Sequence, residues 1–426
     1  MNQQTAALTA FLDSAHSVYH AVAYLVKTLE TAGYSRLEEK DLWTLQPGGK
    51  YYLTRGGSAV LAFRIPHSAP KGFLMSAAHS DRPTFKVKEN GELSGAYTRL
   101  ATEKYGGMLM GTWLDRPLSI AGRVFVETQQ GVECKLFDID RDLLLIPNVA
   151  IHMNRAANDG QKWNPAVDTL PLLGGKDAKG KLAALLEKEA GGKVLGHDLF
   201  LYVRQKAAVW GMEEEYLSSA ALDDLECAWG CTQGFLNSAD TDAIPVLCIF
   251  DSEEVGSSSL QGAGSDLLEA ALGRICSAMD MDLHQMLAQS FMVSADNAHA
   301  LHPNHPEMAD SANAPVMGGG VVIKFNASQR YTTDGLSAAV FRKICAKANV
   351  PVQTYCNRAD IPGGSTLGNI SLAHVSVPSI DIGLAQLAMH SCYETAAVSD
   401  AAALEKSMTA YYGSSLEFSD AGVSIQ

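Results

Sequence analysis

The sequence has 426 residues, of which 47% are hydrophobic, and its formal net charge at pH 7 is −14. A chain of this length can bury a large core and is expected to form two domains. The negative charge, without any lysine- or arginine-rich stretch, argues against nucleic acid and anionic membrane surfaces as partners. Residues 1–10 lack a signal-peptide pattern and no apolar run could span a bilayer, so we expect a cytoplasmic protein. Eight scattered cysteines are expected to be reduced thiols, which agrees with that compartment.

The first part of the chain predicts one helix and several strands. Apolar residues recur at helical spacing from Val18 to Leu29, and Gly33 is placed to end that helix. Three strand patterns follow, at residues 50–54, 58–65 and 72–78. The first two flank a glycine turn and predict a hairpin, and the third ends at His79.

The middle of the chain differs in pattern from the rest. From residue 92 to residue 220, short β-like runs are broken by Gly, Asn and Pro, which predicts an inserted β-rich domain. Residues 1–91 and 221–426 then form one discontinuous domain. Its second part alternates predicted helices at residues 224–236, 266–279, 335–348 and 400–412 with predicted strands at residues 246–250, 291–294, 321–325 and 379–382. This alternation predicts an α/β fold with a mixed, largely parallel sheet flanked by helices.

Side chains that can bind metal follow the ends of four predicted strands. They are His79 and Asp81, Glu253 and Glu254, Asp296, and His390. Because ligands of open α/β sheets bind outside the carboxyl ends of the strands, these side chains could converge on one site. Imidazoles with carboxylates suit zinc, cobalt or manganese, and the set lacks the thiolates typical of structural zinc. So many carboxylates in one cleft would also repel each other unless cations neutralised them.

Each motif has a structural interpretation when it is taken alone. A histidine bonded to a nearby carboxylate is common in protein cores. Asp223 and Asp224 could cap the helix that follows them. His299, His302 and His305 alternate with prolines and favour a structured loop over a metal site. Only the joint pattern points to catalysis.

The ordered motifs resemble those of the aspartyl aminopeptidase family, a group of two-metal exopeptidases, nearly from end to end. The motifs are AHSDRP at 78–83, WLDRPL at 113–118, AIHMNR at 150–155, ALDDL at 221–225, DSEEVGS at 251–257, SADNAHALHPN at 294–304, VIKFN at 322–326, GST at 364–366 and MHS at 389–391. So many matches in one order are highly specific.

The resemblance implies two divalent metal ions per chain, with zinc as the first choice and cobalt or manganese as alternatives. The implied ligands are His79 and Asp296 for one ion, Glu254 and His390 for the other, and Asp223 as the bridge. Asp81 would orient His79. Glu253, next to a ligand, would be the general base that takes a proton from the attacking water. Residues 1–91 and 221–426 would thus form the catalytic domain.

The resemblance also implies peptide substrates, a preference for N-terminal Asp or Glu, and a large homo-oligomer, a dodecamer, with contacts from residues 92–220. His152, His299 and Lys324 would bind substrate, and His152 would act in the site of a neighbouring subunit. Considered alone, His152 could be a strand histidine, and Lys324 a solvated strand end.

Three other functions stay open at this point. The enzyme could prefer neutral or hydrophobic N-terminal residues, or it could hydrolyse N-acyl amino acids with the same two-metal chemistry. A peptide-binding scaffold that has lost turnover is a third alternative, which the intact ligand set disfavours. The sequence alone determines neither the preferred N-terminal residue nor the native metal.

Overall fold

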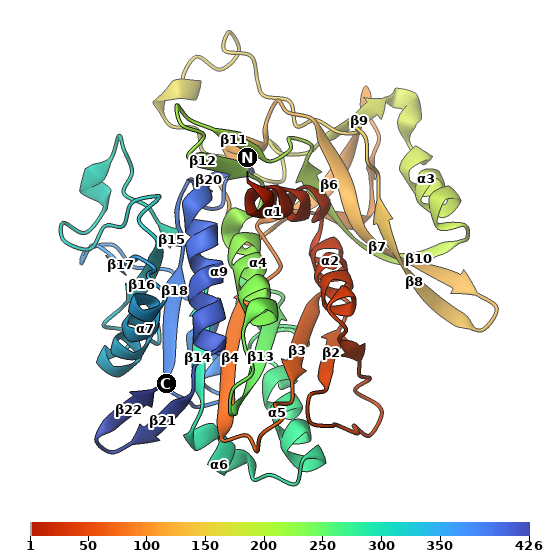
Figure 1. Ribbon diagram of the computed structural model, residues 1–426. Coiled ribbons are helices and arrows are strands. Elements are labelled where there is room, and N and C mark those ends of the chain that lie inside the picture. The colour runs from red at the N-terminus through yellow and green to blue at the C-terminus, as the bar shows by residue number, and fades with distance from the viewer. Residues whose placement is uncertain (1) are drawn as a thin grey trace.

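A nine-stranded mixed sheet forms the centre of the computed structural model, which describes residues 2–426 (Figure 1). In sheet order its strands are β1 (Ser35–Arg36), β2 (Lys50–Arg55), β3 (Ala59–Arg64), β13 (Ala243–Phe250), β4 (Gly72–His79), β14 (Phe291–Ala295), β18 (Ser379–Gly383), β16 (Val321–Phe325) and β17 (Val352–Cys356). The neighbours β13, β4, β14 and β18 run parallel to one another, so their carboxyl ends lie along one edge. This confirms the predicted α/β fold with a mixed, largely parallel sheet.

Helices cover both faces of the large sheet. One face packs against α1 (Gln3–Ser14), α2 (Val18–Thr31), α4 (Leu222–Asn237), α7 (Gly335–Lys347) and α9 (Val398–Tyr412). The other packs against α5 (Leu267–Ala278), α6 (Leu283–Ala288) and α8 (Leu367–Ser371). Strand β13 shows why both faces are apolar: Leu247 and Ile249 pack on the first face, and Val246 and Cys248 on the second. Figure 1 shows α4 and α9 side by side across the first face.

A second, six-stranded sheet lies above the first (Figure 1). Its strands in order are β8 (Gly131–Asp138), β7 (Leu118–Thr128), β10 (Val194–Val203), β5 (Thr84–Leu93), β6 (Tyr97–Tyr105) and β9 (Leu172–Gly175), with α3 (Lys181–Ala190) packed against it. The sheet thus begins at Thr84, before the expected limit of residue 92, because β5 follows β4 almost directly. Its last strand along the chain ends at Val203, before the expected limit of residue 220.

The remaining elements are small. A five-stranded sheet joins β11 (Ala208–Trp210), β12 (Tyr216–Ser219), β20 (Glu394–Ala397), β19 (Ala385–Leu387) and β15 (Ala298–His299), and a hairpin joins β21 (Leu416–Ser419) and β22 (Gly422–Ile425). The 3-10 helices are η1 (Met110–Trp113), η2 (Ala157–Asp159), η3 (Lys176–Ala178), η4 (Glu253–Val255) and η5 (Pro306–Met308). Within residues 2–426, every helix is too short or too polar to cross a membrane.

A long loop, residues 147–168, projects from the top of the molecule in Figure 1. Apart from η2 it has no regular structure, and nearly all of its side chains are exposed. Four of them, Val149, Ile151, Met153 and Val167, are large apolar groups in contact with solvent. Exposed apolar side chains gathered on one segment are typical of a contact with another chain.

Candidate metal centre

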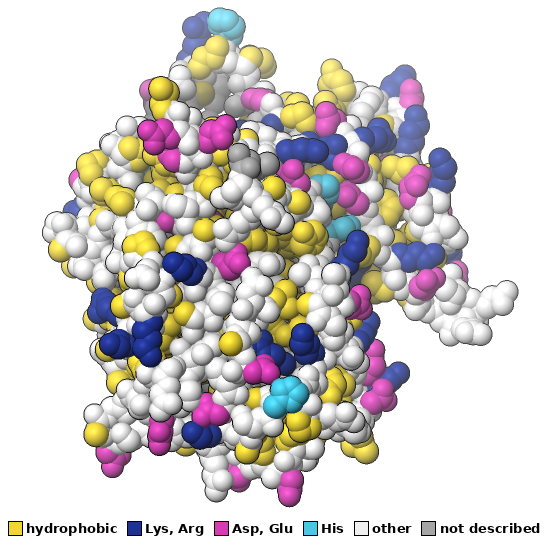
Figure 2. Space-filling view, viewed as in Figure 1, with side chains coloured by type: hydrophobic (Ala, Val, Ile, Leu, Met, Phe, Trp, Pro, Cys, Tyr) yellow, Lys and Arg dark blue, Asp and Glu magenta, His cyan; other side chains and the backbone are white. Residues whose placement is uncertain are grey.

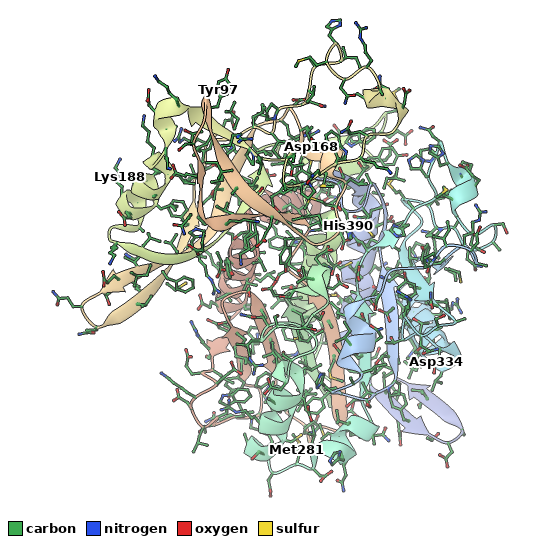
Figure 3. All side chains as sticks on the ribbon, turned by 180° about the vertical axis from the view of Figure 1, so that it is seen from behind. Tyr97, Asp168, Lys188, Met281, Asp334 and His390 are labelled. Atoms are coloured by element: carbon green, nitrogen blue, oxygen red, sulfur yellow. The ribbon has the colours of Figure 1, made fainter. Side chains whose placement is uncertain are left out.

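The five predicted metal ligands meet at the carboxyl edge of the central strands. His79 is the last residue of β4, Glu254 lies in η4 just after β13, and Asp296 directly follows β14. Asp223 lies in the first turn of α4, and His390 lies between β19 and β20. Figure 3 labels His390 near the junction of the large sheet with the upper part of the molecule. The parallel strands therefore bring together residues that are far apart in the sequence.

Asp223 lies between two histidines and contacts each with a different oxygen. Its Oδ1 is 3.4 Å from His79 Nε2, and its Oδ2 is 3.4 Å from His390 Nε2. Glu254 Oε2 is also 3.4 Å from His390 Nε2. A carboxylate that turns one oxygen to each of two imidazoles is placed to bridge two cation sites.

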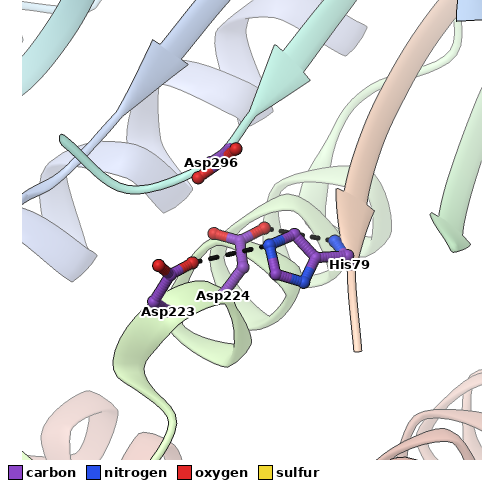
Figure 4. Close-up of side chains that lie close together, drawn as sticks. All are labelled: His79, Asp223, Asp224 and Asp296. Carbon is purple, nitrogen blue, oxygen red and sulfur yellow. Dashed lines mark hydrogen bonds and ion pairs between the residues drawn. The ribbon is translucent and has the colours of Figure 1, made fainter. Parts of the chain in front are cut away.

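The side chains form two clusters that share Asp223. In each cluster, one possible ligand atom per residue lies within 4.8 Å of all the others. The first holds His79, Asp223, Asp224 and Asp296, and the second holds Asp223, Glu254 and His390. Figure 4 shows the first cluster, with His79 facing the two adjacent aspartates. A further cluster of the same kind joins His79 with Glu253 and Glu254.

The chemistry of these residues fits divalent cations. Asp223 Oδ1, Asp224 Oδ1 and Glu254 Oε1 are buried and lack a hydrogen-bond donor within the part of the chain that the structure describes. A buried carboxylate oxygen without a donor is unfavourable, and a bound cation removes that penalty. Imidazole and carboxylate ligands without thiolates are those of catalytic zinc.

Burial raises the pKa of the acidic groups, and contacts with histidines lower it. Burial raises the pKa of Glu253 to about 8 and raises the pKa of Glu254 well above its usual range. Burial acts the same way on Asp223, but its contacts with His390 and His79 outweigh it and hold the pKa of Asp223 low. Of these three acidic groups, Asp223 is therefore the one best prepared to stay charged.

Comparison with known proteins assigns the family of this site. The family model of aminopeptidase I zinc metalloproteases (M18) matches residues 11–412. The chain belongs to this family. A probable M18 family aminopeptidase 2 of Clostridium novyi is 42% identical over 409 residues, which cover 92% of this chain and 94% of the relative. The chain is therefore a zinc metalloaminopeptidase, a hydrolase, and the resemblance to the aspartyl aminopeptidases is confirmed.

Solved structures of the family have the same fold. The cryo-EM structure of the Ape4 and Nbr1 complex contains a chain 34% identical to this one, with a TM-score of 0.93, and the match covers 96% of this chain and 85% of the other. The S. cerevisiae mApe1 dodecamer contains a chain 26% identical, with a TM-score of 0.85 and 96% of both chains covered.

In this M18 chain, two further carboxylates accept hydrogen bonds from the backbone of three predicted ligands. Glu394 accepts hydrogen bonds from the backbone N–H of Asp223 at 3.0 Å and of His390 at 2.7 Å. Asp224 accepts one from the backbone N–H of His79 at 3.1 Å. The sequence patterns suggested only a helix cap for Asp224 and did not indicate Glu394. The available signal was the acidic residue at the start of the short run Glu394–Ala397, which ends in two alanines.

Asp81 likewise accepts hydrogen bonds from backbone N–H groups, in this case those of η4. Its Oδ1 accepts from the backbone N–H of Glu253 and its Oδ2 from that of Glu254, both at 3.1 Å. Its Oδ1 also lies 3.3 Å from His79 Nδ1, on the opposite side of the ring from Asp223. Asp81 thus contacts both the imidazole of one ligand and the turn that carries Glu253.

The substrate-binding candidates lie in three different environments. Lys324 is only 2% exposed, and its ammonium donates to the carbonyls of Asp296 at 2.7 Å and Asn297 at 3.3 Å. It is therefore not a solvated strand end. His299 is exposed and lines a cavity of about 300 Å³ together with two other histidines. His152 lies in an exposed turn of the projecting loop, so it is not a strand histidine, and it belongs to neither metal cluster.

Proposed function

We propose that this chain removes N-terminal residues from peptides with two divalent metal ions that share Asp223. The observation that carries the proposal is the contact of the two Asp223 oxygens with different histidines, each 3.4 Å away. His79 and Asp296 would hold one ion, and Glu254 and His390 the other. Zinc agrees with the family, and the same ligands also suit cobalt or manganese.

The residues around the ions would have different roles in hydrolysis. Bound zinc supplies Lewis acidity, which polarises the scissile carbonyl and lowers the pKa of the attacking water. Glu253 lies beside the centre without being one of the proposed ligands, and it takes the water's proton and passes it to the leaving amine. The side chain of His390 is 34% exposed and that of His79 is 1% exposed, so substrate approaches from the His390 side.

The proposed substrates are peptides that begin with Asp or Glu. The cavity at His299 opens beside β15, two residues after the ligand Asp296, and has room for a side chain. The Lys324 ammonium lies 3.7 Å from Asp296 Oδ1 and would be the cation that pairs with an acidic substrate side chain. Faster cleavage of Leu or Met substrates would favour a neutral preference, and cleavage of N-acyl amino acids without a free amine would favour an N-acyl amino acid hydrolase.

Metal removal tests the two-ion mechanism. We expect about two equivalents of a divalent transition metal per chain by elemental analysis, loss of activity after chelation, and recovery when zinc is added back. Titration of the metal-free protein should show recovery only as the second equivalent binds. Full activity without a bound transition metal would contradict the mechanism, and full activity with one equivalent would contradict the shared Asp223.

A cytoplasmic homo-oligomer completes the proposal. All eight cysteines are free thiols, as expected in a reducing compartment. The exposed apolar residues of the loop at 147–168 and the second sheet would form contacts between subunits. A dodecamer is proposed because mApe1 of S. cerevisiae forms one.

A further inference from the structure

The second sheet reaches the metal centre through the residue that ends β6. Tyr105 donates a hydrogen bond from its hydroxyl to Asp81 Oδ2 at 2.8 Å. Its ring packs edge-on against Phe200 of β10, with centroids 5.7 Å apart. The Asp81 carboxylate therefore has three donors, two backbone N–H groups of η4 and one hydroxyl from a different sheet.

The residues that follow Tyr105 lie beside two proposed metal ligands, Glu254 and His390. A Cβ at Gly106 would lie 3.1 Å from the Cβ of Glu254, and a Cβ at Gly107 would lie 3.8 Å from His390 Nδ1. The backbone N–H of Leu109 donates to the carbonyl of His390 at 3.0 Å. Gly106 also has a φ of +75°, so both its conformation and its neighbours favour glycine.

We propose that Tyr105 is a positioning residue of the metal centre, through which the second sheet fixes Asp81 and the ligands that Asp81 contacts. This inference rests on the proposed function, because it assumes that His79 and Glu254 bind metal. A carboxylate can accept about four hydrogen bonds and can rotate between partners. The Tyr105 hydroxyl fills one position on Oδ2 and keeps Oδ1 within 3.3 Å of His79 Nδ1, which also lies 3.2 Å from the backbone carbonyl of Asp81. Without it, the ring of His79 and the turn at η4 lose a common support.

A simpler explanation is that Tyr105 only fills space between the sheets. Tyr105→Phe separates the two explanations, because phenylalanine keeps the ring contact with Phe200 and removes only the hydroxyl. Tyr202→Phe is the matched control: Tyr202 is buried on β10 of the same sheet and donates its hydroxyl to Asp138 Oδ1 at 2.9 Å, and Asp138 belongs to none of the metal clusters.

The measurement is zinc release from the holoenzyme to an excess of a chromogenic chelator, together with kcat and KM. We expect Tyr105→Phe to release zinc about 10- to 100-fold faster and to lose kcat by a similar factor, the usual effect of removing an outer support of a metal ligand. KM should stay within about threefold, and Tyr202→Phe should match the wild type. Wild-type rates for Tyr105→Phe, or equal losses in both variants, would overturn the inference.

A second pair of variants tests the contact between Gly106 and Glu254. Gly106→Ala should push against Glu254 and speed zinc release. Gly191→Ala is its control, since Gly191 has a similar φ of +71° in the same domain and no atom within 4 Å of an added Cβ. Equal zinc release from the two variants would overturn the role of this contact.

Zinc release needs no substrate, so it separates this inference from the proposed function. A wild-type protein that binds zinc but cleaves no peptide would contradict the function, and the release rates would still decide the role of Tyr105. A wild-type protein that binds no zinc would overturn both.

Discussion

At the scale of single residues, the centre assigns different tasks to acidic groups that are chemically alike. Asp223 contacts both histidines, Glu253 is clustered with His79 and Glu254, and Asp81 accepts hydrogen bonds from backbone N–H groups. Substitutions should therefore have distinguishable effects, although all of them remove a carboxylate from the same small volume.

Glu253→Gln should lower kcat by several orders of magnitude and leave the metal content near two equivalents, because it removes the base and keeps the shape. Asp223→Ala should lose metal and activity together, since it removes the shared ligand. Elemental analysis and kcat measured on the same preparations check both. Wild-type rates in both variants would show that the site is elsewhere.

Lys324→Met tests the basis of the acidic preference. We expect kcat/KM for Asp and Glu substrates to fall about tenfold to a few hundredfold, as for the loss of a charged partner worth about 1.5–3 kcal/mol, with little change for neutral substrates. Metal content is the control, because Lys324 also donates to the Asp296 carbonyl. Loss of metal and of rate on every substrate would show that Lys324 serves instead to hold Asp296.

Part of the centre could be predicted from the sequence because two of its proposed ligands lie at the ends of buried strands. His79 and Asp296 are examples, since an apolar run that stops at a polar residue can be recognised in the sequence alone. Glu394 and Tyr105 could not be found this way, because each acts on groups in a different element. The buried state of Lys324 was also hidden, since it depends on the carbonyls of Asp296 and Asn297.

At the scale of elements, close packing of α4 against α9 positions the segment that carries Asp223. The two helices approach closely where α4 has glycine at positions 230 and 234. A Cβ at Gly234 would lie 2.3 Å from the Cβ of Met408 and 2.9 Å from its backbone carbon. Such contact with backbone cannot be relieved by turning a side chain.

Gly234→Ala should therefore reduce the free energy of unfolding by roughly 1–3 kcal/mol, in spite of alanine's higher helix propensity. Gly273→Ala, in α5, is the matched change, because the nearest atom to its added Cβ is 3.9 Å away. It should stabilise the protein by roughly 0.5–1 kcal/mol. Urea unfolding of the two variants and the wild type checks this, and equal shifts in both would contradict the packing explanation.

Helix α4 also buries the carboxyl group of Glu226, which makes the stability of the fold depend on pH. Burial, with a smaller contribution from Asp400, raises the pKa of Glu226 from its usual value of 4.5 to about 8. The folded chain therefore keeps a proton that the unfolded chain releases between these values. The stability linked to this proton is fully present below pH 4.5 and is lost as the pH rises through 8.

Glu226→Gln should remove this pH dependence. The variant should unfold like the wild type near pH 4.5 and be more stable by roughly 2–5 kcal/mol at pH 8.5. Urea midpoints of the two proteins over this pH range give the difference directly. A difference that does not change with pH would show that Glu226 is not protonated in the folded state.

The predicted elements were most accurate where apolar periodicity is strong. Strand β16 was predicted with the bounds that the structure has, and α7 within one residue. Helix α1 was not predicted, because its apolar positions are diluted by alanine and threonine and its burial depends on contacts with α2 and α4. The start of the second sheet at Thr84 was also not predicted, because β4 and β5 join without a recognisable linker.

At the scale of the whole molecule, the projecting loop is the feature that a single chain does not explain. Residues 147–168 leave apolar groups and His152 in solvent. An oligomer would cover these apolar groups and would place His152 beside a second copy of the chain. The trans role of His152 can be tested without knowing the geometry of the contact.

Complementation between two inactive variants provides the test. Glu253→Gln and His152→Ala should each be inactive or nearly so as homo-oligomers. When the two chains are expressed together, sites with an intact Glu253 can receive His152 from the other chain, so activity should return. Sedimentation should show a large assembly in every case. A fully active monomer, or mixed oligomers as inactive as their parents, would exclude a role in trans.

The spread of the ligands along the chain also has a consequence for biosynthesis. His79, Asp223 and Asp296 are translated well before His390 and Glu394, which lie close to the C-terminal end. Under the proposed ligand assignment, a chain that stops before His390 would have the ligands of one ion but would lack the histidine of the other. If hydrolysis needs both ions, it would begin only after His390 has been translated and has folded into the site, so chains that stop earlier would be inactive toward the cell's other peptides.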